Sequence, residues 1–240
     1  MERNSRSRRN RSTPPRAVLS WSSGKDAAYA LHEVRKAGSY EVVALLTTVV
    51  ARTGRVATHG VRGELLTRQA VSVGLPLTRV MLPPSPSNVV YEKAMASALG
   101  GFLKRGVRHV IFGDLFLEDV RRYREGQLAA LGMVGVFPLW GRETRRLAQD
   151  MIASGLEARL VAVDTHRLPA SWAGRTFDEG LLGEVPPGVD PCGENGEFHT
   201  FVTAGPMMND PVPVHVQAIR ERGGVATADL SLDGTSRPGR

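Results

Sequence analysis

A run of small polar residues near the start of the chain has the composition of a phosphate-binding loop. It follows the apolar run 17–19, precedes the helix-compatible run 27–37, and contains Ser20, Ser22, Ser23, Gly24, Lys25 and Asp26. Small side chains let backbone N–H groups approach an anion, and a helix N-terminus favours negative charge. Lys25 would add a mobile positive charge. These residues indicate a nucleotide-binding loop, and the alternative is an ordinary Ser/Gly turn that caps a helix.

A second cluster of ionisable residues, Glu194, Glu197 and His199, stands late in the chain. Two glycines and Asn195 place it in a loop that enters a strand, from which Glu197 and His199 would project on the same face. Such a trio can act as general acid or base, bind an ammonium group or complete a Mg²⁺ site. The alternative is a polar turn with incidental charges. A zinc site is disfavoured, because no second Cys or His stands at ligand spacing from Cys192 and His199.

Alternating buried strands and amphipathic helices would position these two clusters. Strands are expected at 17–19, 41–48, 76–81, 107–112, 134–137 and 160–163, and helices at 27–37, 61–73, 87–102, 118–131 and 142–154. A strand starts roughly every 25–35 residues, which is typical of βαβ units. The pattern predicts a doubly wound, mostly parallel α/β sheet. Beyond it we expect a short helix at 177–182 and a hairpin over 212–232 that turns at Gly223-Gly224.

Polar residues follow three of the expected strands, and ligands of such sheets bind beyond the carboxyl ends of the strands. The loop at 22–26 follows the first strand, the Thr58-His59 region the second, and Gly113-Asp114 with Glu118 the fourth. All three groups should therefore open on one crevice. Asp114 could ligate Mg²⁺ or position a substrate, and the alternative is an acid that pairs with a helix N-terminus.

The formal charge of +7 is concentrated at the start of the chain. Residues 1–16 carry six arginines against Glu2, which leaves +2 for residues 17–240. The segment 1–15 lacks apolar periodicity, so we expect a disordered tail that could touch RNA or an acidic partner, although a dispensable extension is the better interpretation. Cys192 is the single cysteine, and no secretory or membrane-spanning run is present. A reduced, cytoplasmic setting is predicted, with no membrane partner.

Five segments resemble, in order, those of the diphthine–ammonia ligase family of PP-loop ATP-binding proteins. They are 22–26, 59–66, 112–119, 137–141 and 192–200, within a resemblance that spans residues 16–232. The loop is not a Walker A motif, because Leu19 replaces the first glycine of that pattern and Asp26 follows Lys25. It resembles the PP-loop Ser-Gly-Gly-x-Asp-Ser of enzymes that cleave ATP to AMP and pyrophosphate. Ser23 replaces its first glycine, which predicts no positive φ there, and Ala27 replaces its last serine.

The resemblance implies an adenine-nucleotide α-hydrolase-like, Rossmann-like domain at 16–137 and a smaller α+β domain at 138–232, with tails at 1–15 and 233–240. It implies an ATP and Mg²⁺ site formed by Ser20, Ser22, Ser23, Gly24, Lys25, Asp26, His59, Gly113 and Asp114. Asp114 is the one candidate metal ligand. Contacts to a second substrate are expected from Glu118, Asn195 and Thr200, and catalysis from Glu194, Glu197 and His199.

In the diphthine-modifying branch of this family, ATP activates a carboxylate as an acyl adenylate and ammonia displaces AMP. That branch usually reads Glu-Gly-Gly-Glu-Phe/Tyr-Glu where this chain reads Glu-Asn-Gly-Glu-Phe-His from Glu194 to His199. The latter form resembles a bacterial branch linked to cobalamin-related metabolism. We expect an AMP-forming amidoligase that uses ATP, Mg²⁺, ammonia and a carboxylate, free or protein-borne. A nucleotide-dependent binding or regulatory protein is the alternative, and tRNA thiolation is disfavoured by the lone cysteine.

Overall fold

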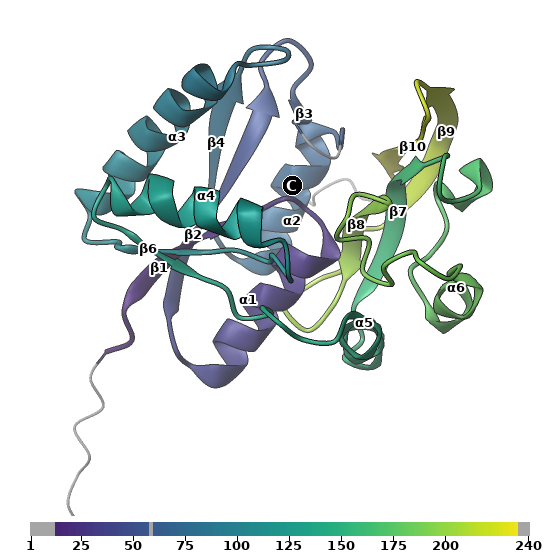
Figure 1. Cartoon of the computed structure of the whole chain (residues 1–240), viewed down its shortest axis with the longest axis horizontal. Helices are drawn as coiled ribbons and strands as arrows, with labels where there is room; N and C mark the ends of the chain where they lie inside the picture. Colours follow the sequence, from purple (N-terminus) through teal and green to yellow (C-terminus); the bar gives the residue numbers. More distant parts are fainter. Residues whose placement is uncertain (1–12, 58–59, 235–240) are drawn as a thin grey trace, which may run out of the picture.

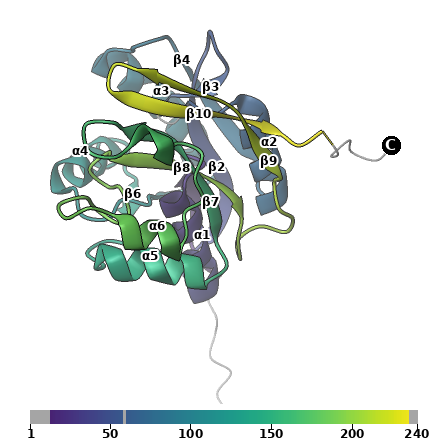
Figure 2. The same cartoon turned by 90° about the vertical axis from the view of Figure 1, so that its right-hand side faces the viewer.

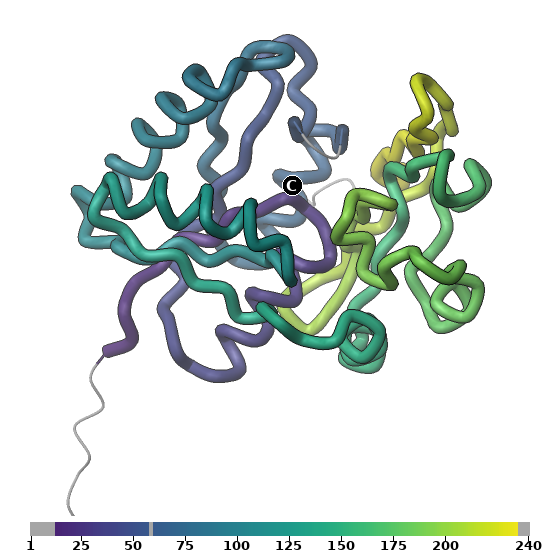
Figure 3. Tube along the Cα trace, in the orientation of Figure 1, coloured from purple at the N-terminus to yellow at the C-terminus, as the bar shows by residue number. Residues whose placement is uncertain are grey.

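The computed structural model describes residues 13–57 and 60–234. Two β-sheets lie side by side, a mostly parallel one with helices on both faces and an antiparallel one built from the C-terminal part of the chain (Figures 1 and 2), and Figure 3 traces the chain through both. In the described ranges, none of the helices combines the length and the apolar character needed to cross a membrane.

In the first sheet, sheet A, the chain adds strands on one side of the first strand and then on its other side. Its strands are β1 (Arg16–Ser20), β2 (Glu41–Val50), β3 (Arg55–Val56), β4 (Leu77–Leu82), β5 (His109–Ile111) and β6 (Val134–Val136). The parallel strands run in the order β4-β2-β1-β5-β6, and β3 pairs antiparallel with the end of β2. The order reverses between β1 and β5, which is where doubly wound sheets bind ligands.

Four helices cover the two faces of sheet A, as the alternating sequence pattern predicts. The helices α1 (Lys25–Ala37) and α2 (Gly63–Val73) share a core with Leu19 of β1, whereas α3 (Asn88–Leu103) and α4 (Glu118–Ala129) share the other core with Val18. Successive side chains of a strand point to opposite faces, so a strand buried on both sides is apolar throughout. The doubly wound α/β fold is therefore confirmed.

Local signals at the ends of helices are also confirmed. Gly38 and Gly74 end α1 and α2 in the left-handed conformation, with φ of 61° and 73°. The Ser87 side chain accepts a hydrogen bond from the Val90 backbone N–H and caps α3.

The second sheet, sheet B, consists of β7 (Glu157–Asp164), β8 (Phe198–Ala204), β9 (Val214–Arg222) and β10 (Val225–Leu232), in the order β8-β7-β10-β9. The strand expected at 160–163 is β7, which pairs antiparallel with β8 and β10 instead of joining sheet A. The expected hairpin is β9–β10. Packed beside sheet B are α5 (Thr144–Ala153), the 3₁₀ helix η1 (Ala170–Trp172) and α6 (Glu179–Glu184). The domain boundary at 137/138 stays a prediction.

A buried amide joins the two parts of the chain next to the phosphate-binding loop. Gln69 of α2 accepts a hydrogen bond from Trp21 Nε1 at 3.1 Å. Its own Nε2 donates to the Ser23 carbonyl at 3.1 Å and to the Val202 carbonyl of β8 at 2.7 Å. Because Gln69 is fully buried, these bonds hold the end of β1 in a fixed position relative to β8.

Candidate functional site

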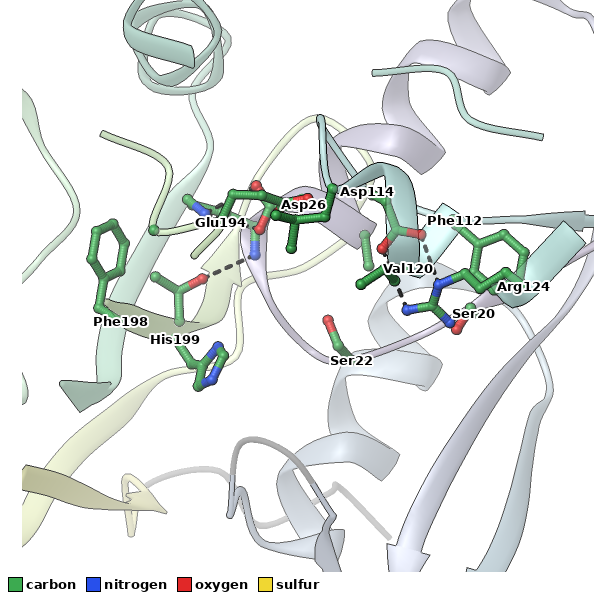
Figure 4. A pocket seen from close by; sticks show the side chains of 16 residues that line it. Ser20, Ser22, Asp26, Phe112, Asp114, Val120, Arg124, Glu194, Phe198 and His199 are labelled. Atoms are coloured by element: carbon green, nitrogen blue, oxygen red, sulfur yellow. Dashed lines mark hydrogen bonds and ion pairs between the residues drawn. The ribbon is translucent and has the colours of Figure 1, made fainter. Parts of the chain in front are cut away.

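A cavity of about 330 Å³ lies where the carboxyl ends of β1 and β5 face β8 (Figure 4). It is lined by Ser20, Ser22, Lys25, Asp26, Ala27, Phe112, Gly113, Asp114, Leu117, Val120, Arg124, Gly193, Glu194, Phe198, His199 and Thr200. The cavity thus combines the loop after β1, the loop after β5 and the late acidic motif, which are far apart in sequence. His59, the remaining expected site residue of the first domain, lies outside the described residues.

The loop from β1 to α1 turns through Ser23, whose φ is +74°. The expectation that Ser23 needs no positive φ is therefore wrong. A non-glycine residue in this conformation costs roughly 1–2 kcal/mol, and surrounding contacts must hold it there. The Ser23 carbonyl accepts hydrogen bonds from Gln69 Nε2 and from the Val202 N–H at 3.0 Å. The loop keeps the glycine-like turn of the PP-loop pattern although a serine occupies the position.

The N-terminus of α1 is capped from the second sheet. The Lys25 backbone N–H donates to Thr200 Oγ1 of β8 at 3.0 Å. Within the loop, Ser22 Oγ accepts a hydrogen bond from the Gly24 N–H at 3.3 Å. Thr200 was expected to contact substrate, and in the structure its hydroxyl also satisfies a helix N–H. The first turn of α1 lines the cavity beside Ser22, and a helix N-terminus favours an anion.

Lys25 links the loop to the late motif. Its Nζ lies 2.9 Å from both carboxylate oxygens of Asp26 and donates to the Cys192 carbonyl. The rings of Phe177 and Phe198 lie 5.6 and 5.4 Å away. Burial lowers the Lys25 pKa, but Asp26, Cys192 and Glu194 together outweigh this effect, so the pKa is raised and the side chain stays charged. The expected mobile charge is therefore wrong, because Lys25 is 2% exposed and held on several sides.

Gly113 allows the loop after β5 to approach the start of α1. A Cβ at Gly113 would lie 2.6 Å from the Asp26 carbonyl carbon and 2.7 Å from the Ala27 nitrogen. Real Cβ atoms do not approach backbone this closely, so only glycine fits here.

Asp114 and Arg124 form an ion pair at the opposite end of the cavity (Figure 4), with Arg124 Nε 2.7 Å from Asp114 Oδ2. The Arg124 guanidinium also lies over the Phe112 ring, 4.5 Å from its centre. Burial raises the Asp114 pKa, and Arg124 opposes that shift. Arg124 is a cavity residue that the sequence motifs did not single out, and its position in the helix after Asp114 was the available signal. Glu118 is exposed at the start of α4 and does not line the cavity.

Glu194 is held at the cavity wall by two backbone groups. Its Oε1 accepts a hydrogen bond from the Leu115 N–H at 2.7 Å, and its own N–H donates to Asp190 Oδ2 at 2.8 Å. Burial raises the Glu194 pKa to about 7, although the bond from Leu115 opposes this shift. A carboxyl group with such a pKa can exchange a proton at neutral pH.

Glu197 does not line the cavity. Its side chain is fully buried, and Oε1 accepts hydrogen bonds from the Asp190 N–H at 3.0 Å and from Asn195 Nδ2 at 3.2 Å. Arg167 Nη1 lies 3.2 Å from the same oxygen. The expectation that Glu197 and His199 share a face is therefore wrong, because Glu197 precedes β8 and turns back into its own loop. Asn195 likewise contacts Glu197 instead of lining the cavity.

His199 lines the cavity from β8, across from Asp114 and Arg124 (Figure 4). Burial lowers its pKa, and the positive charge of Lys25 adds to this effect. The imidazole is therefore neutral at pH 7 and suited to hydrogen bonding or to accepting a proton.

Three carboxylates, Asp26, Asp114 and Glu194, line the cavity. Within the described ranges, no group of three or more His, Cys, Asp or Glu side chains is arranged to hold a metal ion by itself. The arrangement therefore fits Mg²⁺ that shares oxygen ligands from bound phosphates, which is how Mg²⁺ is usually held in nucleotide sites.

Comparison with known proteins assigns both parts of the chain to one family. Residues 15–133 match the family model described as the diphthamide synthase N-terminal domain. Residues 143–225 match the diphthamide synthase C-terminal domain. The chain belongs to the diphthine–ammonia ligase family.

Individual relatives agree with this assignment. The chain is 29% identical to a diphthine–ammonia ligase of Danio rerio over 218 residues, which cover 80% of this chain and 83% of that protein. It is 33% identical to the Rattus norvegicus protein of that name over 109 residues and to the Homo sapiens one over 104 residues. Each of these two matches covers 41% of this chain and 39% of the relative.

The cavity of this family member lies between the two matched parts. Its walls up to Arg124 come from the part that matches the N-terminal domain, and those from Gly193 to Thr200 come from the C-terminal one. The diphthine–ammonia ligase family is one of ATP-dependent amidoligases, so both matched parts contribute to the candidate site of a ligase.

Proposed function

We propose that this protein is an AMP-forming amidoligase, which converts a carboxylate to an amide at the expense of ATP in a reduced, cytoplasmic setting. The observation that carries the proposal is a single cavity with a helix N-terminus on one wall and Glu194, whose pKa is about 7, on another. The first feature suits phosphate and the second suits proton transfer.

The phosphates of ATP would lie against the loop at 22–26. Ser20 and Ser22 offer hydroxyl groups there, whereas Ser23 and Gly24 do not line the cavity and shape the turn. Gly113 lets the loop after β5 pack against the start of α1. The N-terminus of α1 would stabilise the pyrophosphate that leaves. Mg²⁺ bound with ATP would neutralise phosphate charge beside Asp26 and Asp114.

The reaction has two displacements. A carboxylate oxygen of the acceptor attacks the α-phosphorus of ATP, and pyrophosphate leaves. Ammonia then attacks the acyl carbon, the bond between that carbon and the AMP oxygen breaks, and the nitrogen loses a proton. Glu194 would accept this proton, and the neutral imidazole of His199 would orient the acceptor, since both side chains line the cavity. Glu197 acts by holding Asp190, which in turn holds Glu194.

The acceptor is a carboxylate, free or carried by a protein. Diphthine is one candidate, because the relatives are named for it. A precursor in cobalamin-related metabolism is the second, because Asn195 and His199 depart from the pattern of the diphthine-modifying branch. The Arg-rich tail remains a candidate contact for RNA or an acidic partner.

One observation favours a second function, a nucleotide-dependent binding protein without turnover. Lys25 is fixed by Asp26 and Cys192 and is not free to follow a phosphate as it departs. A protein that holds ATP in this cavity could then report nucleotide binding to a partner.

Product analysis separates these functions. The protein is incubated with ATP, Mg²⁺ and ammonium across a panel that contains diphthine-bearing elongation factor, cobalamin precursors and simple alkanoates. AMP and pyrophosphate should form with an active acceptor, together with its amide. ADP as the only product would contradict the proposal. Tight ATP binding without turnover on any carboxylate would favour the binding protein, and reactions without ammonium serve as the control.

A further inference from the structure

A second cavity shares His199 with the candidate ATP site. Its volume is about 330 Å³, and its walls include Ala57, Gly60, Ala162, Val163, Asp164, Gly196, His199, Val225 and Thr227. Among the described residues, His199 alone lines both cavities. The imidazole thus stands at a junction between the site for ATP and a hollow that the ATP site does not use.

The register of sheet B gives this hollow a continuous floor. Ala162 of β7 lies opposite His199 of β8 on one side and opposite Thr227 of β10 on the other. Side chains directly opposite one another in neighbouring strands project on the same face. His199, Ala162 and Thr227 therefore form a row across three strands, and Asp164 lies opposite Val225 one step further along. The floor is made of small side chains, which leaves room for a ligand.

The hollow continues outward to the edge of the molecule. A neighbouring depression shares Gly60 and Thr227 with the first, and it is lined by Arg55, Gly60, Val161, Arg220, Thr227, Ala228 and Asp229. Arg220 is exposed on β9, so the combined groove opens to solvent at the β9–β10 hairpin, which projects at the edge of the second sheet in Figure 2. We use the name acceptor groove for this path from His199 to Arg220.

Two arginines join the wall that contains Gly60 to β10 of sheet B. Arg55 donates through Nη1 to the Gly60 carbonyl at 2.8 Å and through Nη2 to Asp229 Oδ1 at 3.0 Å. Arg62 also binds Asp229, at 2.9 and 2.7 Å. These bonds set the separation between Gly60 and β10, so the groove has a defined width.

We propose that the acceptor groove binds the carboxylate substrate of the amidoligase reaction, with its carboxyl group at His199 and its body over Ala162 and Thr227 towards the hairpin. The inference rests on the proposed function. Of the described residues that line the groove, only His199 also lines the ATP site, so the groove admits a long acceptor without displacing the nucleotide. Its length and small, largely apolar floor select a carboxyl group at the end of an extended chain over a compact acid such as acetate.

The test compares two tryptophan substitutions of equal size in one hairpin. Thr227→Trp fills the acceptor groove. Ile219→Trp on β9 is the control, because Ile219 lines neither depression and its side chain is 53% exposed. Binding of hexanoate and acetate is measured by saturation-transfer NMR on protein that holds a non-hydrolysable ATP analogue, and nucleotide affinity is measured by calorimetry.

Hexanoate should bind the wild type more tightly than acetate. Thr227→Trp should weaken hexanoate binding about tenfold or more while nucleotide affinity changes less than about twofold, and Ile219→Trp should change neither. Equal hexanoate binding in both variants, or no alkanoate binding to the wild type, would overturn the inference. If Thr227→Trp leaves AMP formation unchanged, the proposed role of the groove is wrong and the proposed ligase function stands. If alkanoate binding depends on Thr227 but no carboxylate yields AMP, the ligase function is wrong and the groove still binds carboxylates.

Discussion

At the scale of single residues, Glu194 and Glu197 show how two carboxylates of one motif take different roles. Glu194 reaches the cavity and has a pKa of about 7, because burial disfavours its charged form. Glu197 is fully buried and is surrounded by Asp190, Asn195 and Arg167. A group that accepts a proton must touch the reacting atoms. Glu194 lines the cavity and Glu197 does not, so the direction of each side chain decides its role.

Glu194→Gln should lower the rate of AMP formation. It should also remove the acidic limb of the rate–pH profile, which is the rise of the rate with pH through about 7. Glu194 must be deprotonated to act as a base, so the wild-type rate should rise with pH through about 7.

The raised pKa means that Glu194 favours folding most at low pH and that this contribution is lost as pH rises through about 7. Glu194→Gln should therefore be the more stable variant at pH 8. Rate–pH profiles at a constant concentration of free ammonia, together with urea unfolding, test both effects. Glu118→Gln, at an exposed site outside the cavity, is the control, and a retained acidic limb in Glu194→Gln would contradict the base assignment.

At the scale of elements, the site depends on how closely two loops approach. The start of α1 is capped by Thr200 of β8, and Gly113 after β5 packs against Asp26 and Ala27. The carboxyl ends of β1 and β5 are adjacent because the strands pair in parallel from Ala17 to Leu19. The phosphate-binding geometry is therefore a property of two loops and a strand from the other sheet together.

Gly113→Ala should weaken ATP binding about tenfold or more, since the added methyl group must push the start of α1 away from its position. Gly126→Ala is the matched control, because a Cβ there meets no atom within 4 Å and Gly126 lies inside α4. It should stabilise the protein by about 0.5–1 kcal/mol without changing nucleotide affinity. Calorimetry with ATP and thermal unfolding measure both variants. Normal affinity in Gly113→Ala would show that the loops can separate without loss of the site.

At the scale of the whole molecule, Asp229 ties sheet B to sheet A. It accepts hydrogen bonds from Arg62 and Arg55, which lower its pKa to about 2 against the opposing effect of burial. Arg55 belongs to β3 and Arg62 precedes α2, whereas Asp229 belongs to β10. This cluster and the Gln69 bonds hold the two halves of the cavity at a fixed separation.

Asp229→Asn should destabilise the protein at neutral pH and lower turnover on carboxylates. Because the folded pKa lies below the ordinary value, the stabilisation is present above about pH 4 and is lost as pH falls through about 2. The difference in urea midpoint between wild type and variant should therefore shrink over that range. Glu184→Gln breaks an exposed pair with Arg175 inside one part of the chain and should have little effect. A difference that persists unchanged at pH 2 would contradict the assignment.

The sequence by itself determined the order of elements, the doubly wound fold and most of the cavity. The period of apolar residues follows from which faces are buried, and Gly38, Gly74 and Ser87 mark helix ends through local backbone geometry. Such signals act over a few residues, so they can be interpreted without knowing the tertiary structure. The motif resemblance also identified the family.

Only the tertiary structure decided where the polar side chains point. The partner of Lys25, the Cys192 carbonyl, lies 167 residues away. The positive φ of Ser23 depends on bonds from Gln69 and Val202, and the acceptor groove depends on the register of three strands. Strand register and the contact between two sheets are set by packing of the whole chain, and a shift of one residue would turn His199 to the other face. Local sequence patterns carry no information on strand register or on the contact between the sheets, and these two features form the cavity.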